Sequence, residues 1–242
     1  MNIIETQNLT KSYADFTAVS NVNLHIPKGA VYGFLGPNGA GKSTTMKMFL
    51  GLTKPTSGSF TIYVKKYPEA RVEILKEVGS FIEAPAFYGN LSGEENLEII
   101  RKILGLPKSS VSEALEIVGL TQFRKRLAKK YSLGMKQRLG LASALIGQPP
   151  ILILDEPTAA LDPIAENQLY LKYSELTDGK LSFFISHRLS STRFCDRILF
   201  MSGGQITEMG THEELMAKKG AYYKMFQVQS YYYREQGVAV HA

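Results

Sequence analysis

The chain has 242 residues, of which 44% are apolar, enough for one large domain or two small lobes with a sizeable core. Lys and Arg number 28 against 22 for Asp and Glu, so the formal net charge is +6, which suits nucleic acid, an anionic membrane surface or a polyphosphate without choosing among them. Cys195 is the single cysteine and excludes an internal disulfide, while the lack of a signal-peptide pattern and of any run near roughly 18 apolar residues predicts a cytoplasmic protein.

The first predicted elements are antiparallel strands. Apolar residues mostly alternate over residues 3–13 and 18–26, as in half-buried strands, and a Pro-Lys-Gly turn follows. His25 falls on the polar side of this alternation and is interpreted as a solvated strand residue. Tyr13 has two interpretations at this point: an aromatic that stacks on a purine base, or a residue that fills core or surface.

The next segment carries a phosphate-binding pattern. An apolar strand-length run ends at Gly36, and a helix-forming run begins at Lys42 and stops at Gly51. Gly36, Gly41, Lys42 and Ser43 match G-x-x-x-x-G-K-[ST], in which glycines let backbone N–H groups surround an anion at a helix N-terminus. Lys42 then supplies a charge for the β and γ phosphates, and the Ser43 hydroxyl suits Mg²⁺. The flanking strand and helix disfavour a mere Gly-rich turn.

Helices dominate the middle of the chain. After predicted strands over residues 60–64 and 78–82, the stretch 92–146 contains no convincing strand and at least three helical runs. Ser92 with Glu95 forms a capping box, and Ser110 with Glu113 is expected to cap a second helix that ends near Gly119. This pattern predicts a helical lobe inserted into an α/β body. Its basic stretch over residues 124–130 is interpreted as a solvated helix face, with a partner surface or nucleic acid as alternatives.

Buried strands return in the last third of the chain. Residues 151–154 and 181–186 are continuous apolar runs, typical of strands buried on both faces of a parallel sheet. Residues 197–201 and 205–210 flank two glycines as a hairpin. Thr211 and Glu214 make a further capping box, and the aromatic tail is interpreted as a packed terminal helix.

Two acidic residues follow the first of these buried strands. Open α/β sheets bind ligands at such strand ends. Asp155 suits a Mg²⁺ contact through water, and Glu156, if ionised, can polarise an attacking water molecule. A purely structural role is disfavoured because unpaired buried carboxylates are costly.

At this point the chain resembles the ATP-binding cassette (ABC) family over nearly all its length. Beside the phosphate loop and the acidic strand end, residues 131–138 resemble the family signature LSGGQ-x-Q-R. Residues 160–162 resemble its D-loop and residues 185–187 its switch histidine. Tyr13 falls where the family keeps an aromatic that stacks on adenine, which favours the first of its two interpretations. A second signature-like stretch, residues 91–95, is better explained as the capping box.

Three departures from the family pattern stand out. Tyr131, Leu133 and Met135 replace family residues in the signature, so its anion-binding chemistry is left to Ser132, Gly134 and the start of the following helix. A second departure is Glu83, which occupies the place of a γ-phosphate-sensing glutamine; this change and the altered signature resemble the branch that exports bacitracin and lantibiotic peptides. In the third, residues from about 159 onward resemble cassettes fused to membrane domains in exporters. The chain therefore combines features of two branches of the family, as a mosaic.

The resemblance implies an α/β fold, a P-loop NTPase cassette of the ABC type. It has a mixed-sheet core, an antiparallel β subdomain and an inserted α-helical subdomain. Residues 1–242 would form a single ABC ATP-binding domain, with about 1–85 and 149–242 in the nucleotide-binding core and β lobe and about 86–148 in the helical subdomain.

The resemblance also implies how the chain works. Two cassettes would pair head to tail with ATP between them, the phosphate loop of one facing Ser132 and Gly134 of the other. Glu156 would activate water, His187 would brace the γ-phosphate and Glu156, and Lys42 would neutralise phosphate charge; Ser43 and Asp155 would hold Mg²⁺. The implied nucleotide contacts are Tyr13, Gly36, Pro37, Asn38, Gly39, Ala40, Gly41, Lys42, Ser43, Thr44, Glu83, Ser132, Gly134 and Asp162.

The leading hypothesis is the ATP-hydrolysing subunit of an exporter. It would act with a separate transmembrane permease and a second cassette at the inner face of the cell membrane, with a peptide antibiotic as favoured cargo. One alternative is a soluble cassette ATPase that acts on ribosomes or nucleic acid. It is disfavoured because translation-type members carry two cassettes and repair-type members a long coiled coil. The other is an ATP-binding sensor with weak turnover, which the altered signature keeps open.

Overall fold

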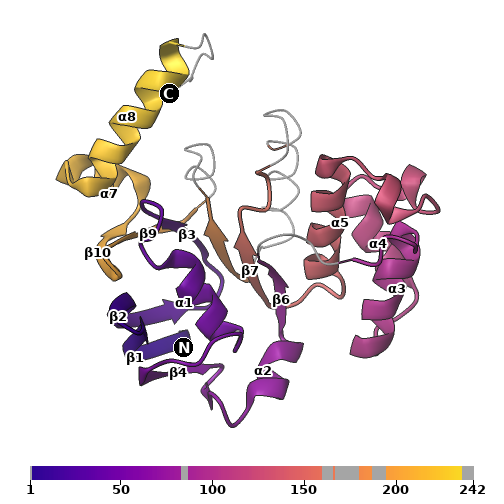
Figure 1. Ribbon diagram of the computed structural model, residues 1–242, viewed down its shortest axis with the longest axis horizontal. Helices are drawn as coiled ribbons and strands as arrows, with labels where there is room; N and C mark the ends of the chain where they lie inside the picture. Colours follow the sequence, from indigo (N-terminus) through magenta and orange to yellow (C-terminus); the bar gives the residue numbers. More distant parts are fainter. Residues whose placement is uncertain (1, 83–86, 160–165, 167–179, 187–194, 236–242) are drawn as a thin grey trace.

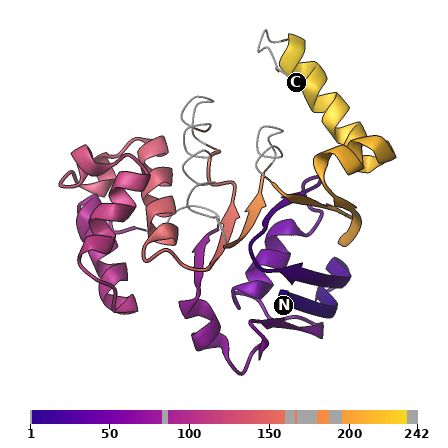
Figure 2. The ribbon, with the colours of Figure 1, turned by 180° about the vertical axis from the view of Figure 1, so that it is seen from behind.

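The computed structural model describes residues 2–82, 87–159, 166, 180–186 and 195–235 (Figure 1). Within these residues the chain forms a six-stranded sheet, a four-stranded sheet and a group of helices to one side. The helical group consists of α3 (Gly93–Leu104), α4 (Ser109–Ile117) and α5 (Leu133–Leu145). Figures 1 and 2 place this lobe beyond β6 (Val78–Phe81) and β7 (Ile151–Asp155), away from the four-stranded sheet.

The six-stranded sheet is mixed. Its order is β10-β9-β3-β8-β7-β6, and all neighbours pair in parallel except the hairpin of β9 and β10. The predicted mixed-sheet α/β fold is therefore confirmed. The strands not yet given bounds are β3 (Val31–Leu35), β8 (Leu181–Ile185), β9 (Arg197–Ser202) and β10 (Gln205–Gly210).

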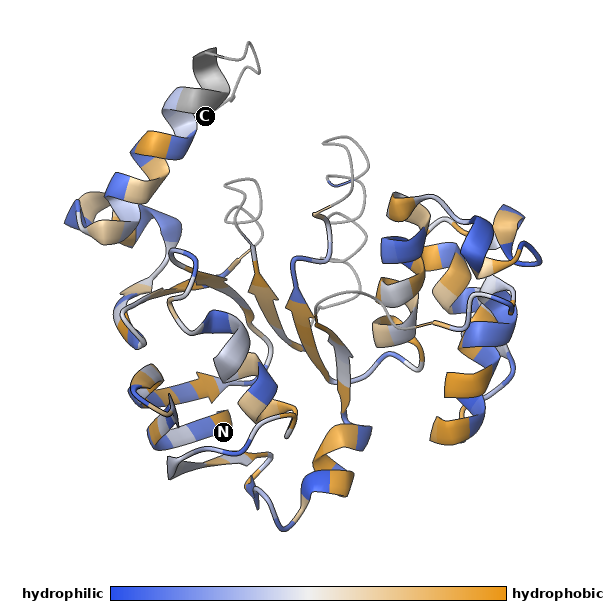
Figure 3. Cartoon of the chain, in the orientation of Figure 1, coloured by the Kyte–Doolittle hydropathy of each residue, from blue (hydrophilic) through white to orange (hydrophobic). Residues whose placement is uncertain are grey.

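The continuous apolar run of β7 has a simple explanation in packing. Ile151 and Ile153 belong to the core cluster shared with the four-stranded sheet, whereas Leu152 and Leu154 belong to the cluster of the helical lobe. Alternate residues of a strand point to opposite faces, so both faces of β7 must be apolar. Figure 3 shows the same uniformly hydrophobic colouring in the central strands.

The four-stranded sheet is antiparallel, as the alternation predicted. β1 (Asn2–Tyr13) pairs with β2 (Phe16–Pro27) and with β4 (Ser57–Ile62), and β5 (Lys65–Lys66) completes the edge. The predicted strand over residues 60–64 was wrong at both ends. It begins earlier, and it stops before Tyr63 and Val64, whose φ values of 52° and 57° form a left-handed turn that cannot continue a strand.

Helix α1 (Lys42–Phe49) joins the two sheets. The Phe49 ring centroid lies 5.6 Å from that of Phe60 on β4 and 6.1 Å from that of Phe183 on β8. Phe60 also stacks on Tyr67 at 4.8 Å, just before the short helix α2 (Arg71–Lys76). Burial of one such phenylalanine stabilises the fold by about 1.5–3 kcal/mol, so this aromatic contact holds α1 firmly in register with the sheet.

The helical lobe confirms one predicted cap and corrects another. Ser92 Oγ accepts from Glu95 N–H at 3.2 Å and Glu95 Oε2 accepts from Ser92 N–H at 2.7 Å, a complete capping box for α3. The Ser110 cap was wrong, because α4 begins at Ser109 and Ser110 lies buried inside its first turn. The chain already turns helically at Lys108 after Pro107, whose ring pre-sets a helical φ.

The basic stretch is not the predicted helix face. It lies around two 3₁₀ turns, η1 (Thr121–Phe123) and η2 (Ala128–Lys130). Glu94 on α3 accepts from Arg124 Nη2 at 2.7 Å and from Lys125 Nζ at 2.9 Å, and these cations lower the Glu94 pKa from 4.5 to about 2. Part of the basic charge is therefore neutralised within the lobe.

Replacing Glu94 with Gln should lower the free energy of unfolding by about 1 kcal/mol at neutral pH, the scale of a partly exposed ion pair. The folded-state pKa of Glu94 lies below 4.5, so the pair stabilises fully above that pH and loses its effect as pH falls toward 2. Urea unfolding at pH 7 and at about pH 3 checks this, with Glu116→Gln as a matched control on α4. An equal difference at both pH values would contradict it.

The chain ends in two helices, α7 (His212–Lys218) and α8 (Ala221–Glu235). Thr211 and Glu214 form the predicted capping box. Tyr222 is fully buried and its hydroxyl lies 2.7 Å from His212 Nδ1, which confirms the predicted packing for the first turn of α8. Farther along, α8 projects from the body in Figure 1, and Tyr231 is 59% exposed.

Candidate nucleotide-binding site

The phosphate loop between β3 and α1 depends on two glycines for its shape. Gly36 has φ of 138° and Gly41 φ of 103°, both in the region that other residues rarely adopt. A Cβ at Gly36 would clash with the Met201 carbonyl oxygen, and one at Gly41 with the Ala18 carbonyl oxygen. The glycines are thus required by the close approach of β9 and β2 as well as by the turn itself.

The β9–β10 turn anchors the loop from outside. Gly204 N–H donates to the Ala40 carbonyl at 3.2 Å, and the Gly204 carbonyl accepts from Ser20 N–H at 2.8 Å. Gly204 has φ of 79°, and a Cβ there would lie 3.1 Å from the Ala18 carbonyl oxygen. Sequence analysis identified this glycine pair as a hairpin turn but missed its contact with the phosphate loop.

Gly204→Val should therefore weaken ATP binding about tenfold. A valine at this left-handed φ is strained by about 1–2 kcal/mol, and the turn relieves the strain by shifting, which displaces its hydrogen bond to Ala40 in the phosphate loop. Gly203→Val is the matched control: its φ is 55°, but a Cβ there meets nothing within 4 Å. Calorimetric titration with ATP compares the two variants, and thermal unfolding corrects for stability. Equal loss of affinity in both would show that strain alone, rather than the loop contact, is responsible.

Helix α1 offers its N-terminus to an anion. It begins at Lys42, with no side chain capping the first turn and no acidic residue in it. Thr45 Oγ1 and Thr45 N–H both donate to the Gly41 carbonyl at 2.9 Å, which ties the loop to the helix. Free first-turn N–H groups and the helix dipole together favour a phosphate at this point.

Lys42 is held inside the loop. Its side chain is buried, and Nζ donates to the Gly36 carbonyl at 2.8 Å and to the Pro37 carbonyl at 2.9 Å. Burial lowers the pKa of Lys42, and the negative charges of Asp155 and Glu156 oppose that shift. The charges of the acidic strand end therefore act on Lys42, and a ligand shared by the two stays a prediction.

The acidic pair is placed beside the loop through β8. Asp155 pairs in register with Ile185, and Glu156 N–H donates to the Ile185 carbonyl at 2.9 Å. Glu156 has φ of 48°, an unusual conformation for glutamate, and strained backbone of this kind occurs at active sites among other places. Because β8 lies between β7 and β3, the ends of all three strands meet at one edge of the sheet.

A hollow of about 240 Å³ opens at this edge. The predicted contacts Asn38 to Thr44 line it, and Ile185 closes one side. Phe16 and Ala18 from β2 also line it, and neither was predicted from the sequence.

A second hollow, of about 490 Å³, lies between α3, α4 and Arg124. Its lining includes three carboxylates that already have partners: Glu94 binds Arg124, Glu95 binds Ser92 and Glu98 binds Arg101.

Tyr13 lies near the hollow but is not among the residues that line it. It ends β1, opposite Phe16 across a two-residue turn, and is 48% exposed. The Lys11 ammonium lies 4.7 Å from the centre of its ring, and the Tyr13 hydroxyl lies 3.5 Å from Thr53 Oγ1. One face of the predicted stacking ring is thus covered.

The signature residues lie in the helical lobe. Ser132 is the N-cap of α5, and its hydroxyl accepts from Met135 N–H at 3.2 Å; Gly134 follows in the first turn. Tyr131, the first altered position, is 4% exposed and donates to the Phe123 carbonyl at 2.9 Å, so it serves the lobe's core. Figures 1 and 2 place α5 and α1 on opposite sides of β7, so the structure does not bring Ser132 and Gly134 to this chain's own phosphate loop.

Three predicted site residues, Glu83, Asp162 and His187, lie outside the described residues. Nearby, Thr158 Oγ1 donates to Glu166 Oε1 at 2.7 Å and both side chains are buried. This bond links Thr158, two residues after Glu156, to Glu166, and nothing in the local sequence pattern indicated it.

Comparisons with known proteins decide the family. The model of the ABC transporter family matches residues 19–159. The bacitracin transport ATP-binding protein BcrA of Enterococcus faecalis is 45% identical over 224 residues, which cover 91% of this chain and 73% of BcrA. The chain belongs to the ABC transporter family. This cassette is accordingly the ATP-binding, ATP-hydrolysing subunit of a transporter, as the resemblance implied.

Further relatives agree with this assignment. The lantibiotic transport ATP-binding protein SrtF of Streptococcus pyogenes is 44% identical over 206 residues, covering 84% of this cassette and 89% of SrtF. Among solved structures, the dimeric ATP-binding cassette MJ0796 with ADP and phosphate bound matches with a TM-score of 0.80 and 26% identity, over 86% of this cassette and 98% of that chain. The predicted resemblance to the bacitracin and lantibiotic branch is confirmed; the mosaic with fused exporters stays a prediction.

Proposed function

We propose that this cassette powers the export of a peptide antibiotic, of the bacitracin or lantibiotic kind, through a separate membrane permease. BcrA and SrtF, named for bacitracin and lantibiotic transport, support the cargo. Among the described residues no helix is long and apolar enough to cross a membrane. The cassette would then bind peripherally at the inner face of the membrane.

The observation that carries the catalytic part is the strand order: β8 lies between β7, which ends at Asp155, and β3, which leads into the phosphate loop, and the charges of Asp155 and Glu156 act on Lys42. It joins the phosphate loop to the acidic strand end across β8. In this proposal Lys42 and the loop amides from Gly36 to Thr44 neutralise phosphate charge. Glu156 accepts a proton from the attacking water, and His187 braces it; Glu83 and Asp162 complete the nucleotide contacts.

Mg²⁺ fits the oxygen donors at this edge. The Ser43 hydroxyl and the Asp155 carboxylate are ligands that a hard cation prefers, and they would hold it. Among the described residues no cluster of three His, Cys, Asp or Glu side chains forms a closed metal site. Such an open donor set suits Mg²⁺, which keeps several waters and binds substrate phosphates. When bound, the ion supplies neutralisation of the charge that develops during phosphoryl transfer.

A second cassette would complete the site. Ser132 and Gly134 begin α5, on the far side of β7 from the phosphate loop, so within one chain they have no nucleotide to contact. The N-terminus of α5 carries the positive end of a helix dipole, with Ser132 as its cap on Met135 N–H. A head-to-tail pair would bring it to the partner's ATP, and the dimeric MJ0796 cassette supports that assembly.

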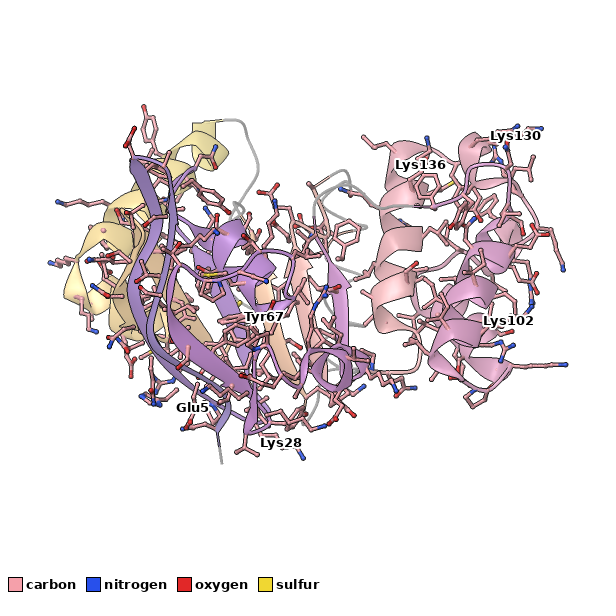
Figure 4. The ribbon with its side chains drawn as sticks, turned by 60° about the horizontal axis from the view of Figure 1, so that its bottom comes forward. Glu5, Lys28, Tyr67, Lys102, Lys130 and Lys136 are labelled. Carbon is pink, nitrogen blue, oxygen red and sulfur yellow. The ribbon has the colours of Figure 1, made fainter. Side chains whose placement is uncertain are left out.

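The alternative of a nucleic-acid partner is disfavoured by the basic stretch itself. Arg124 and Lys125 pair with Glu94, and Lys129 Nζ donates to Asn90 at 3.1 Å. In Figure 4 the labelled Lys130 and Lys102 lie at opposite ends of the helical lobe, so Lys102 does not extend the basic stretch into a larger patch. The buried, structural role of Tyr131 likewise weakens the case for a sensor with a damaged signature.

The test measures ATP hydrolysis by the purified cassette alone, with RNA, and with membrane vesicles that contain a co-expressed permease. We expect stimulation by permease vesicles and none by vesicles that lack the permease. Membrane fractionation should recover the cassette with the vesicles only when the permease is present. Stimulation by RNA without any by the permease would overturn the proposal in favour of a nucleic-acid ATPase, and ATP binding without turnover would favour a sensor.

A further inference from the structure

Phe16 is an exposed aromatic residue for which neither the family pattern nor the proposed catalytic steps provide a role. It begins β2 and is 59% exposed, yet it lines the same hollow as Asn38 to Thr44. The other β2 residue in that lining, Ala18, is buried against the phosphate loop. Phe16 therefore forms the outer, open side of the hollow, beyond the part that surrounds phosphate.

The turn between β1 and β2 sets the position of Phe16. Phe16 and Tyr13 are directly paired across the loop Ala14-Asp15, with Ala14 at φ of 45°. Side chains of directly paired residues lie on the same side of an antiparallel ladder. The hairpin tip thus presents two aromatic rings side by side, and the two rings have different neighbours.

Tyr13 already has contacts with Lys11 and Thr53. Lys11 is fixed by a hydrogen bond from Nζ to the Lys54 carbonyl at 2.9 Å, and the same ammonium lies over the Tyr13 ring. A base could stack only on the other face of that ring without displacing Lys11. Phe16 has no polar atom and borders the hollow directly, so it offers apolar area next to the loop.

We propose that Phe16 is a nucleoside-binding residue of this cassette: its ring packs against the base and ribose of the nucleotide whose phosphates the Gly36–Thr44 loop holds. This inference rests on the proposed nucleotide site and deepens it. Tyr13 and Phe16 then share the nucleoside, one ring on each strand of the hairpin. Phe16 contributes through burial of apolar area and stacking, which need no hydrogen bond and do not depend on the phosphates.

The test compares ligands that differ only by the nucleoside. ADP and inorganic pyrophosphate are titrated calorimetrically into the full chain, wild type and variants. Phe16→Ala should weaken ADP binding about tenfold, the scale of one lost base–aromatic contact, and change pyrophosphate binding less than about twofold. Phe16→Tyr should retain ADP affinity. Phe123→Ala removes a similarly exposed ring from the helical lobe and is the matched control.

The outcomes separate this inference from the proposed site. Wild-type chain that binds neither ligand would refute the nucleotide site itself. Wild-type binding with an unchanged ADP affinity in Phe16→Ala would overturn the role of Phe16 alone. Equal losses of ADP and pyrophosphate would also overturn it, because they would indicate that Phe16 shapes the phosphate loop rather than binding the nucleoside.

Discussion

Replacing Glu156 with Gln should nearly abolish ATP turnover, by about 10³-fold, while leaving ATP affinity close to wild type. The loss is expected because an amide cannot accept the proton of the attacking water, and general-base catalysis is typically worth 10²–10⁴-fold. Binding is preserved since Gln has nearly the same size and Glu156 N–H still donates to the Ile185 carbonyl. The variant should also accumulate as an ATP-bound dimer.

Single-turnover hydrolysis, calorimetry with ATP and size-exclusion chromatography measure the three consequences separately. Glu73→Gln is the control, because it makes the same chemical change on α2, where Glu73 pairs with Lys65 at 2.9 Å. A Glu156→Gln cassette that hydrolyses ATP at a rate comparable with wild type would refute the assigned role. Loss of ATP binding would instead point to a structural role for the carboxylate.

The second large effect is expected at Lys42. Lys42→Ala should weaken ATP binding by about 100-fold, since charge-assisted hydrogen bonds to phosphate are worth about 1.5–3 kcal/mol each. The side chain is buried, and its loss leaves the Gly36 and Pro37 carbonyls without this donor. Lys42→Met fills more of the same space and separates the missing charge from the missing volume.

Calorimetry with ATP and thermal unfolding are measured together for both variants. Lys28→Ala, on an exposed lysine at the far end of the β lobe in Figure 4, controls for a general loss of positive charge. If Lys42→Met folds normally and binds ATP as tightly as wild type, the lysine has no part in phosphate binding.

Predictions from the sequence were correct where all the residues that determine a local structure lie within one short segment. The phosphate loop needs Gly36 and Gly41 at a fixed spacing from Lys42, and β7 needs both faces apolar; each requirement is visible within a few residues. The Ser92 and Thr211 caps are likewise local. The Ser110 cap failed because a neighbouring proline competed for the same helix start.

Contacts between distant segments could not be read in this way. The Met201 carbonyl excludes a side chain at Gly36, and Gly204 supports Ala40, although a long stretch of chain separates each pair. Phe16 has no motif around it, and only the β1–β2 pairing brings it to the hollow. The same holds for Lys125, which lies in a turn and whose partner Glu94 lies on helix α3.

The sequence by itself determined the family, the phosphate loop and the acidic strand end, because spacing along one short segment dictates how backbone amides and carboxylates are presented. Only the tertiary structure decided that Lys42 Nζ is held by the Gly36 and Pro37 carbonyls, that Phe16 rather than Tyr13 borders the hollow, and that α5, which begins at Ser132, lies across β7 from the phosphate loop. These depend on strand order and on which segments pack together, and packing free energy is shared among residues far apart in the chain.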